Sequence, residues 1–496
     1  MPRRHPLAAV LGLALGTPLL LLAPPASADG VAQPYDFNGD GFPELVVGAP
    51  GLTVGSKGEA GGISVLPASK DGVSEAGVVI TQASAGVPGD AAQDQRFGSA
   101  FASADFDHDG YADLAVGTPY QSEGDRGRVV VLRGSTSGLT TSGAYSLVRA
   151  GTSDFDNFGV SLAAADFDGD GFADLAVGAI TADRVESPEY GPNGSVTIFQ
   201  GGQATFSAQR TTVLHGQRTG EDYDLLFGSS LAVGDVDGDA RPDLVVGSLG
   251  LPYDDGEGHD GSVSVCTSGD AGPGGCHHVA VGYSTGSTAL AVGNVEGDQR
   301  NEIVVGQPQE NPDRDDPGVV CTLALAGTGS SLKAKATKLT QAIKGVPGSN
   351  EKNDEFGYAV ALGDLDSDGY ADLVVGSDAE AIGSRKHAGR VTVVYGGKKG
   401  YRTSGNKVYD QNTKGVPGTA ESGDGFGTAV SLRDHDVDGH LDLTVGTPGE
   451  NDGVGGITTL DGSGKSFTTK GAKTFGLGAL AYPEPGVAAF GESLSR

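Results

Sequence analysis

Residues 166–179 read DFDGDGFADLAVGA, and variants of this stretch recur six more times along the chain. Its first half places carboxylates at Asp166, Asp168 and Asp170, followed by Gly171 and then by Asp174. Carboxylates at alternate positions, closed by a glycine that can adopt a positive φ, let a short loop curl until its oxygens face a common point. We therefore expect a hard cation at that point, and a strand in the apolar run that follows.

The repeat is evenly spaced along the chain. The other loops begin at Asp36 (DFNGDGFPEL), Asp105 (DFDHDGYADL), Asp235 (DVDGDARPDL), Asn294 (NVEGDQRNEI), Asp364 (DLDSDGYADL) and Asp434 (DHDVDGHLDL). Successive starts are 69, 61, 69, 59, 70 and 70 residues apart. Self-similarity at this period predicts a closed or stacked array of supersecondary units.

Each repeat also predicts four strands. A Phe-Gly pair stands eight residues before the loop in five copies: Phe97-Gly98, Phe158-Gly159, Phe227-Gly228, Phe356-Gly357 and Phe426-Gly427. A small and apolar alternation follows it, the loop then leads into a run such as DLAVG, and two further strand-like runs complete the unit. Each unit is therefore expected to be a four-stranded antiparallel meander.

This order of features resembles the FG-GAP repeat of the integrin α-subunit head, which implies an all-β, seven-bladed β-propeller as a single domain over residues 29–496. The first loop lacks an upstream Phe-Gly, but Phe490 and Gly491 supply one near the C-terminus. We therefore expect the C-terminal strand to pair with the N-terminal blade and close the ring, which hides the sheet edges. The meander places all metal loops on one rim. The resemblance implies partner contacts on the other rim, where segments 120–127, 181–194, 251–260 and 309–317 are long and polar.

The loops differ from an EF-hand, because their last carboxylate is at position nine and their flanks are strands. Oxygen donors without His or Cys favour Ca²⁺, with Mg²⁺ as second choice, at about six sites. The candidate ligands, counting the backbone carbonyl at position seven, are Asp36, Asn38, Asp40, Phe42 and Glu44; Asp105, Asp107, Asp109, Tyr111 and Asp113; Asp166, Asp168, Asp170, Phe172 and Asp174; Asp235, Asp237, Asp239, Arg241 and Asp243; Asp364, Asp366, Asp368, Tyr370 and Asp372; Asp434, Asp436, Asp438, His440 and Asp442. The alternative, plain Asx-turn hairpins without metal, leaves converging carboxylates to repel one another.

Two loops depart from the pattern. The loop at Asp235 has Ala240 in place of the glycine, which predicts a strained turn. The loop at Asn294 lacks the first carboxylate, has Glu296 at position three and has Gln299 in place of the glycine. We expect that second site to be weak or empty.

The N-terminus indicates the compartment. Residues 1–28 combine Arg3 and Arg4, an apolar stretch and a small-residue end, which is typical of a secretory signal peptide. An uncleaved anchor is the alternative, although prolines interrupt the apolar stretch. No second segment approaches membrane-spanning length, so we expect a secreted protein. Cys266 and Cys276 are expected to form a disulfide there, and Cys321 to be a buried free thiol.

Charge and motifs limit the function. The net charge of −31 argues against partners such as nucleic acid and anionic lipid. Residues 282–286 match G-x-S-x-G and residues 461–466 resemble the end of a P-loop, but neither has the required helix context. We expect a monomeric, non-enzymatic binding or adhesion module for an extracellular protein or glycan. The alternative is a carbohydrate-active hydrolase or lyase at the central channel, suggested by the acidic residues Asp254, Asp255, Glu257, Asp313 and Asp316.

Overall fold

A computed structural model describes residues 31–120, 127–149, 156–182, 194–202, 210–216, 226–249, 261–279, 289–308, 317–480 and 486–495, with residues 206, 218, 219, 222, 223 and 482. The expected signal peptide, the G-x-S-x-G stretch at 282–286 and most of the long polar segments lie outside the described residues, as do the five acidic residues that suggest a catalytic channel.

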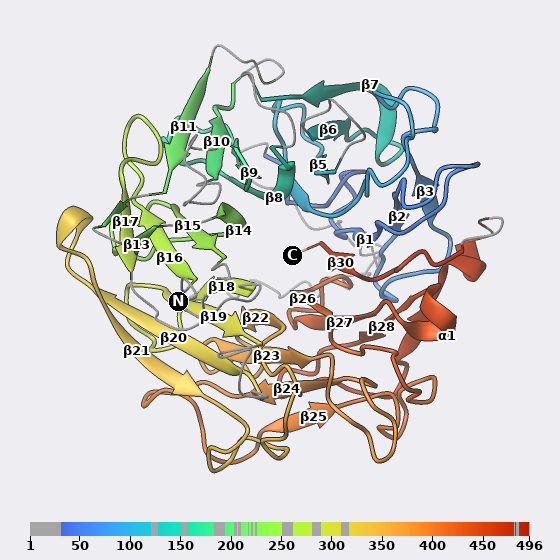
Figure 1. Ribbon diagram of the computed structural model, residues 1–496, viewed down its shortest axis with the longest axis vertical. Helices are drawn as coiled ribbons and strands as arrows, with labels where there is room; N and C mark the ends of the chain where they lie inside the picture. Colours follow the sequence, from blue (N-terminus) through green and yellow to red (C-terminus); the bar gives the residue numbers. More distant parts are fainter. Residues whose placement is uncertain are drawn as a thin grey trace, which may run out of the picture.

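Seven four-stranded antiparallel sheets are arranged as blades around a central axis, as predicted from the seven repeats (Figure 1). In each blade the first strand is innermost and the fourth is outermost. The strands of the first four blades are, from the inside outwards, β30 (Ser493–Leu494), β1 (Leu45–Ala49), β2 (Gly62–Leu66) and β3 (Val78–Ile80); β4 (Phe101–Ala104), β5 (Asp113–Thr118), β6 (Arg128–Arg133) and β7 (Thr140–Leu147); β8 (Phe158–Ala165), β9 (Asp174–Ala179), β10 (Ser195–Phe199) and β11 (Thr211–His215); β14 (Phe227–Gly234), β15 (Asp243–Ser248), β16 (Ser262–Cys266) and β17 (Cys276–Val279).

The last three blades follow the same order. Their strands are β18 (Ala289–Gly293), β19 (Glu302–Gln307), β20 (Val319–Ala326) and β21 (Lys333–Leu339); β22 (Ala359–Gly363), β23 (Asp372–Ser377), β24 (Arg390–Val394) and β25 (Lys407–Tyr409); β26 (Ala429–Arg433), β27 (Asp442–Thr447), β28 (Gly456–Leu460) and β29 (Lys473–Phe475). The remaining elements are the short hairpin β12 (Arg218–Thr219) and β13 (Asp222–Tyr223), the helix α1 (Glu450–Gly453) and the 3-10 turns η2 (Gly329–Ser331) and η3 (Leu477–Leu480). In the described part of the chain, no helix is long and apolar enough to cross a membrane.

The two ends of the chain meet in the first blade, as the displaced Phe-Gly pair predicts. Strand β30 pairs antiparallel with β1, with Leu494 opposite Val47 and Ser493 opposite Gly48. The backbone N–H of Ser495 also donates to the Val46 carbonyl at 3.0 Å. The ring is therefore closed by strand pairing between residues about 450 positions apart.

The hydrophobic core is divided among the junctions between blades. Second strands such as β5 and β9 are buried along their whole length, so each contributes side chains to both of its faces. Seven apolar clusters fill the described part of the molecule, and each joins two neighbouring blades. One of them joins the last blade to the first, through residues such as Ile457 and Leu45. The core is therefore a continuous ring.

Neighbouring blades approach each other most closely at two glycines. A Cβ added to Gly376, in the second strand of blade six, would lie 2.0 Å from the carbonyl oxygen of Gly427, the Phe-Gly glycine of blade seven. The same approach, at 2.0 to 2.3 Å, occurs at Gly48, Gly117, Gly178, Gly306 and Gly446. Gly427 itself has a φ of 102°, in the region where glycine is favoured. Only glycine fits at these second-strand positions, because the backbones of the two neighbouring blades are in direct contact there.

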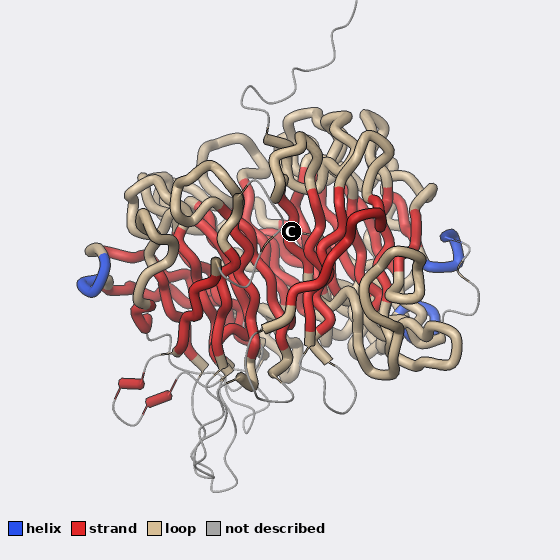
Figure 2. The backbone as a smooth tube through the Cα atoms, turned by 90° about the horizontal axis from the view of Figure 1, so that it is seen from above, coloured by secondary structure: helices blue, strands red, loops and turns tan. Residues whose placement is uncertain are grey.

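The predicted disulfide and the free thiol are both present. Cys266 and Cys276 lie opposite each other on β16 and β17 and are disulfide-bonded, while Cys321 is a buried free thiol on β20. The P-loop-like residues 461–466 form part of the turn between β28 and β29. Figure 2 shows the strands running between two rims of loops.

Gly376→Ala is expected to lower the free energy of unfolding by about 3 kcal/mol, because the added methyl group overlaps a backbone oxygen that cannot move independently. Gly58→Ala is the matched control, because no atom lies within 4 Å of its added Cβ. Urea unfolding of both variants measures the difference. Equal stability of the two variants would show that the close approach is not a constraint.

Candidate metal sites on one rim

The predicted loops lie on one rim, where each joins the first strand of a blade to the second. In six of them the aspartate at position one accepts the backbone N–H groups of positions five and six. In the third blade, Asp166 accepts Asp170 N at 3.1 Å and Gly171 N at 2.9 Å. The equivalent acceptors are Asp36, Asp105, Asp235, Asp364 and Asp434. These bonds curl the loop as the sequence pattern indicates.

The curl brings carboxylates together in five loops. Each cluster has one oxygen per residue within 4.8 Å of the others, and the members are Asp105, Asp107 and Asp109; Asp166, Asp168 and Asp170; Asp235, Asp237 and Asp239; Asp364, Asp366 and Asp372; Asp434, Asp436 and Asp442. The first loop differs because Asn38 occupies position three. Its amide accepts from Asp40 N at 2.7 Å and donates to Glu44 at 2.7 Å.

Position three carries an oxygen without a partner in three loops. The Oδ1 atoms of Asp107, Asp237 and Asp366 are buried and accept no hydrogen bond. Leaving a carboxylate oxygen buried without a donor is costly, and the same atom is unsatisfied each time. Because all the donors are hard oxygens, the residues fit a cation of the Ca²⁺ or Mg²⁺ type.

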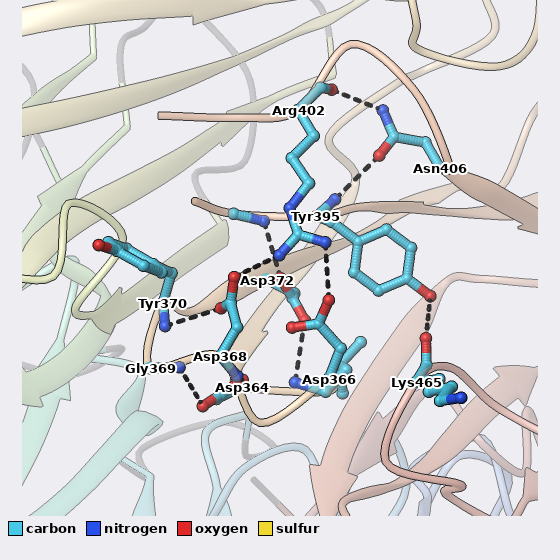
Figure 3. A network of polar contacts seen from close by, with 12 residues as sticks. Asp364, Asp366, Asp368, Gly369, Tyr370, Asp372, Tyr395, Arg402, Asn406 and Lys465 are labelled. Carbon is cyan, nitrogen blue, oxygen red and sulfur yellow. Dashed lines mark hydrogen bonds and ion pairs between the residues drawn. The ribbon is translucent and has the colours of Figure 1, made fainter. Parts of the chain in front are cut away.

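Arginines hold the other oxygen of two of these carboxylates. Arg402, from the turn between β24 and β25, donates to Asp366 Oδ2 at 2.7 Å and also to Asp368 (Figure 3). Arg133 likewise donates to Asp107 Oδ2. In both loops the arginine fixes one carboxylate oxygen and leaves Oδ1 unbonded, so a cation would meet an oriented ligand. The sequence pattern of the loops contains no sign of these arginines.

The carboxylate at position nine has a second role that the sequence interpretation missed. Asp174 accepts Phe167 N at 3.1 Å, within its own loop, and Gly201 N at 2.7 Å, from the turn between the third and fourth strands. Asp243, Asp372 and Asp442 make the same pair of bonds. Position nine therefore ties the loop to the neighbouring turn whether or not it also binds a cation. It belongs to the carboxylate cluster in two loops, through Asp372 and Asp442.

Burial raises the pKa of these position-nine carboxyls, with nearby aspartates adding to the effect in most of them. The pKa rises to about 7 for Glu44, Asp113 and Asp442, and to about 6 for Asp174, Asp243 and Asp372. Backbone hydrogen bonds act in the opposite direction but do not cancel the burial.

The loop at Asn294 keeps the position-nine hydrogen bonds within the loop but not the carboxylate cluster. Glu302, at position nine, accepts Val295 N at 2.7 Å and Glu296 N at 3.0 Å. At position one, the Asn294 amide nitrogen donates to the Asp298 carbonyl at 2.7 Å, on the side where an aspartate would present its second oxygen. Among the described residues this loop forms no three-carboxylate group. Retention of Glu302 here is the signal that position nine is structural.

Hydrogen bonds link adjacent loops at three junctions, and we call these linked loops the belt. The N–H at position eight donates to the first carbonyl of the preceding loop, from Ala112 to Asp36 at 3.1 Å, from Asn301 to Asp235 at 2.8 Å and from Ala371 to Asn294 at 2.7 Å. Side chains at position seven cover the same neighbour, and Phe172 stacks on His108 with ring centroids 4.1 Å apart. Position seven thus packs its side chain on the preceding blade.

A different hydrogen bond links the first and last loops, where the two ends of the chain meet. Pro43 occupies position eight of the first loop and has no N–H to donate. Instead, His435 Nδ1 of the last loop lies 2.7 Å from the Pro43 carbonyl. Burial lowers the pKa of His435 to about 4, so the ring is neutral and donates this proton.

The strained turn predicted in the fourth loop is confirmed. Ala240 has a φ of 70°, a backbone conformation that residues other than glycine rarely adopt. Its N–H still donates to Asp235 at 2.8 Å, so the loop keeps the common conformation despite the strain.

A closed seven-bladed propeller with acidic hairpin loops along one rim is a defined class of repeat protein. Five segments of this chain, residues 31–66, 97–132, 158–199, 227–266 and 356–394, match the FG-GAP repeat. The chain therefore contains FG-GAP repeats, as its motif order predicts.

Similar proteins include both integrins and an enzyme. The chain is 36% identical to mouse (Mus musculus) integrin alpha-3 and 37% identical to mouse integrin alpha-7, in each case over 31% of this chain and over 14% and 12% of the relative. It is 35% identical to phosphatidylinositol-glycan-specific phospholipase D of Bos taurus, over 32% of this chain and 19% of that protein. The chain thus spans less than a fifth of the length of each of these relatives.

The raised pKa values predict a pH dependence of the metal-stripped protein. Carboxyls whose pKa is raised on folding bind more protons in the folded than in the unfolded state between about pH 4 and pH 7. The free energy of unfolding should therefore fall as pH rises through this window. Thermal unfolding in EDTA should give a lower midpoint at pH 8 than at pH 5.

Saturating Ca²⁺ should remove this decline, because a bound cation favours the ionised carboxylates. The variant Asp442→Asn should show a shallower decline in EDTA, since one of the titrating groups is gone. An unchanged midpoint from pH 5 to pH 8 in EDTA would contradict the prediction.

Proposed function

We propose that this protein is a secreted, calcium-binding, monomeric propeller that acts as an extracellular binding or adhesion module for a protein or glycan. The unpartnered Oδ1 atom at position three, repeated in three loops, supports the cation sites most directly. The similarity to integrin alpha subunits supports the binding role, and the disulfide between Cys266 and Cys276 is compatible with an oxidising compartment.

Calcium is the cation that this donor set suits best. Ca²⁺ accepts six to eight oxygens in a flexible arrangement that includes backbone carbonyls, whereas Mg²⁺ requires near-octahedral geometry and retains water. The residues that would hold it are the carboxylates at positions one, three and five, the carbonyl at position seven, and position nine where it belongs to the cluster. The ion would neutralise these carboxylates and stiffen the belt of loops. Its proposed role is structural.

Calorimetric titration of the EDTA-stripped protein with Ca²⁺ should show about six sites and a large rise in the thermal midpoint, because the ions bind the folded state alone. The double variant Asp366→Asn/Asp368→Asn should lose one site. The control Glu296→Gln, in the loop without a cluster, should leave the number of sites unchanged. Absence of binding together with an unchanged midpoint would show that the loops are plain turns.

A pocket on the opposite rim bears on the enzymatic alternative. It has a volume of about 370 Å³ and lies between blades six, seven and one, with Glu355, Asp378, Asp424 and Glu492 among its lining residues. Asp378 is hydrogen-bonded to Glu355, and burial followed by the charge of Glu355 raises the pKa of Asp378 to about 8. Glu492 is paired with Arg96 at 2.8 Å.

This arrangement supports binding better than hydrolysis. Catalytic carboxyl pairs of glycosidases stand about 5 to 9.5 Å apart so that a sugar bond or a water fits between them. Two carboxyl groups joined by a hydrogen bond leave no such space. We therefore propose that the protein is not an enzyme, and turnover of a polysaccharide substrate by the purified protein would overturn this proposal.

The proposed binding activity is tested by recovering a partner from native extracellular material on the immobilised protein. Retention should require Ca²⁺ and be lost in EDTA, because the ions hold the propeller rigid. Failure to retain any protein or glycan in Ca²⁺, by a protein shown to be folded, would count against the binding role.

A further inference from the structure

The lysines of this acidic chain are gathered in one region. Thirteen of the fifteen lysines lie between residues 333 and 473, that is, from the last strand of blade five to blade seven. The stretches 333–350 and 396–409 contain no Asp or Glu, although the whole chain has 64 acidic residues. Such segregation is not expected if lysines serve only to keep the surface soluble.

These two stretches lie side by side on the outer wall of the ring. The first contains β21, the outermost strand of blade five, and the second leads into β25, the outermost strand of blade six (Figure 1). Asn406 Nδ2 donates to the Gly345 carbonyl at 2.8 Å, and the hydroxyl groups of Thr322 and Tyr401 lie 2.9 Å apart. The two stretches therefore form one surface across the junction between the blades.

We name this surface the lysine wall, and its members are Lys333, Lys335, Lys344, Lys398, Lys399 and Lys407. All six are exposed, and within the described part of the chain none of them forms an ion pair. Lys333 and Lys335 point to the same face of β21, about 7 Å apart along the strand. The wall therefore presents a row of ammonium groups with no neutralising partner.

Lysines on outer strands are also a device against edge-to-edge aggregation. That explanation predicts lysines on every outermost strand, since all seven edges are alike. The outermost strands of blades one to four, β3, β7, β11 and β17, contain none. The lysines are thus specific to one sector of the ring.

We infer that the lysine wall binds a linear anionic polysaccharide carrying carboxylate or sulfate groups. This inference deepens the proposed function, on which it rests, by assigning the glycan partner a charge and a surface. A thin polymer can follow the convex wall, which borders the acidic rim at the turn of Lys398 and Lys399, because rim charges more than about 8 Å from it are largely screened at physiological salt. A membrane or a DNA duplex is a broader anionic surface that would also meet the rim carboxylates.

The test uses the full chain loaded with Ca²⁺, with heparin as the sulfated probe and alginate as the carboxylated probe. Wild-type affinity should fall steeply as NaCl is raised from 50 to 300 mM. The variants Lys333→Glu/Lys335→Glu and Lys398→Glu/Lys399→Glu should each lose about tenfold or more in affinity at low salt. The control Lys57→Glu/Lys70→Glu makes the same change in net charge on blade one and should stay within about twofold of wild type.

Several results would overturn the inference that the lysine wall binds an anionic polysaccharide. Binding to neither glycan, or equal losses in the control and the wall variants, would overturn it. So would binding to a 20-base-pair DNA duplex or to phosphatidylglycerol vesicles that is as tight as binding to the glycans. Calcium stoichiometry measured on the same preparation separates the two proposals, since the calcium sites lie on other residues and do not depend on the wall.

Discussion

The backbones of neighbouring blades are in direct contact at glycines. At Gly376 and Gly427, and at the five equivalent junctions described, a second-strand glycine faces the carbonyl of the next Phe-Gly pair with no room for a side chain. This approach sets the distance between blades, and the apolar clusters at the seven junctions fill the space that remains. Strand β30 supplies the innermost strand of the first blade, so the last junction is equivalent to the others.

The acidic loops are positioned by this packing of the blades. Their carboxylates act first as acceptors for backbone N–H groups, and this role needs no ion. Position one curls the loop, and position nine attaches it to the turn beside it. In three loops the backbone leaves the buried Oδ1 atom at position three without a donor, and a cation fits there. The cation would therefore complete a loop that is already shaped, and would offset repulsion among carboxylates gathered on one rim.

Much of the fold was predictable because the repeat encodes it locally. Seven loops, a Phe-Gly pair before each of five, and the displaced pair at Phe490 together give seven blades and their closure. The strained Ala240 and the disulfide between Cys266 and Cys276 also follow from residue type and spacing. The double role of position nine was not predicted, because a carboxylate that accepts backbone N–H groups and one that ligates a metal look the same in a sequence. The loop at Asn294 separates the two roles, because Glu302 still accepts backbone N–H groups although this loop forms no carboxylate cluster.

The sequence by itself determined the number of blades, the direction of each strand and the rim on which the acidic loops lie. These properties are set by turn residues and by the alternation of apolar side chains within about 70 residues, so they can be deduced one repeat at a time. Only the tertiary structure decided which groups distant in the sequence meet: Arg402 with Asp366 and Glu355 with Asp378 within blade six, and the stretch 333–350 with the stretch 396–409 across the junction of blades five and six. Such contacts depend on how the turns of one blade lie side by side and on how closely neighbouring blades pack, and the residue pattern of the repeat does not contain that information.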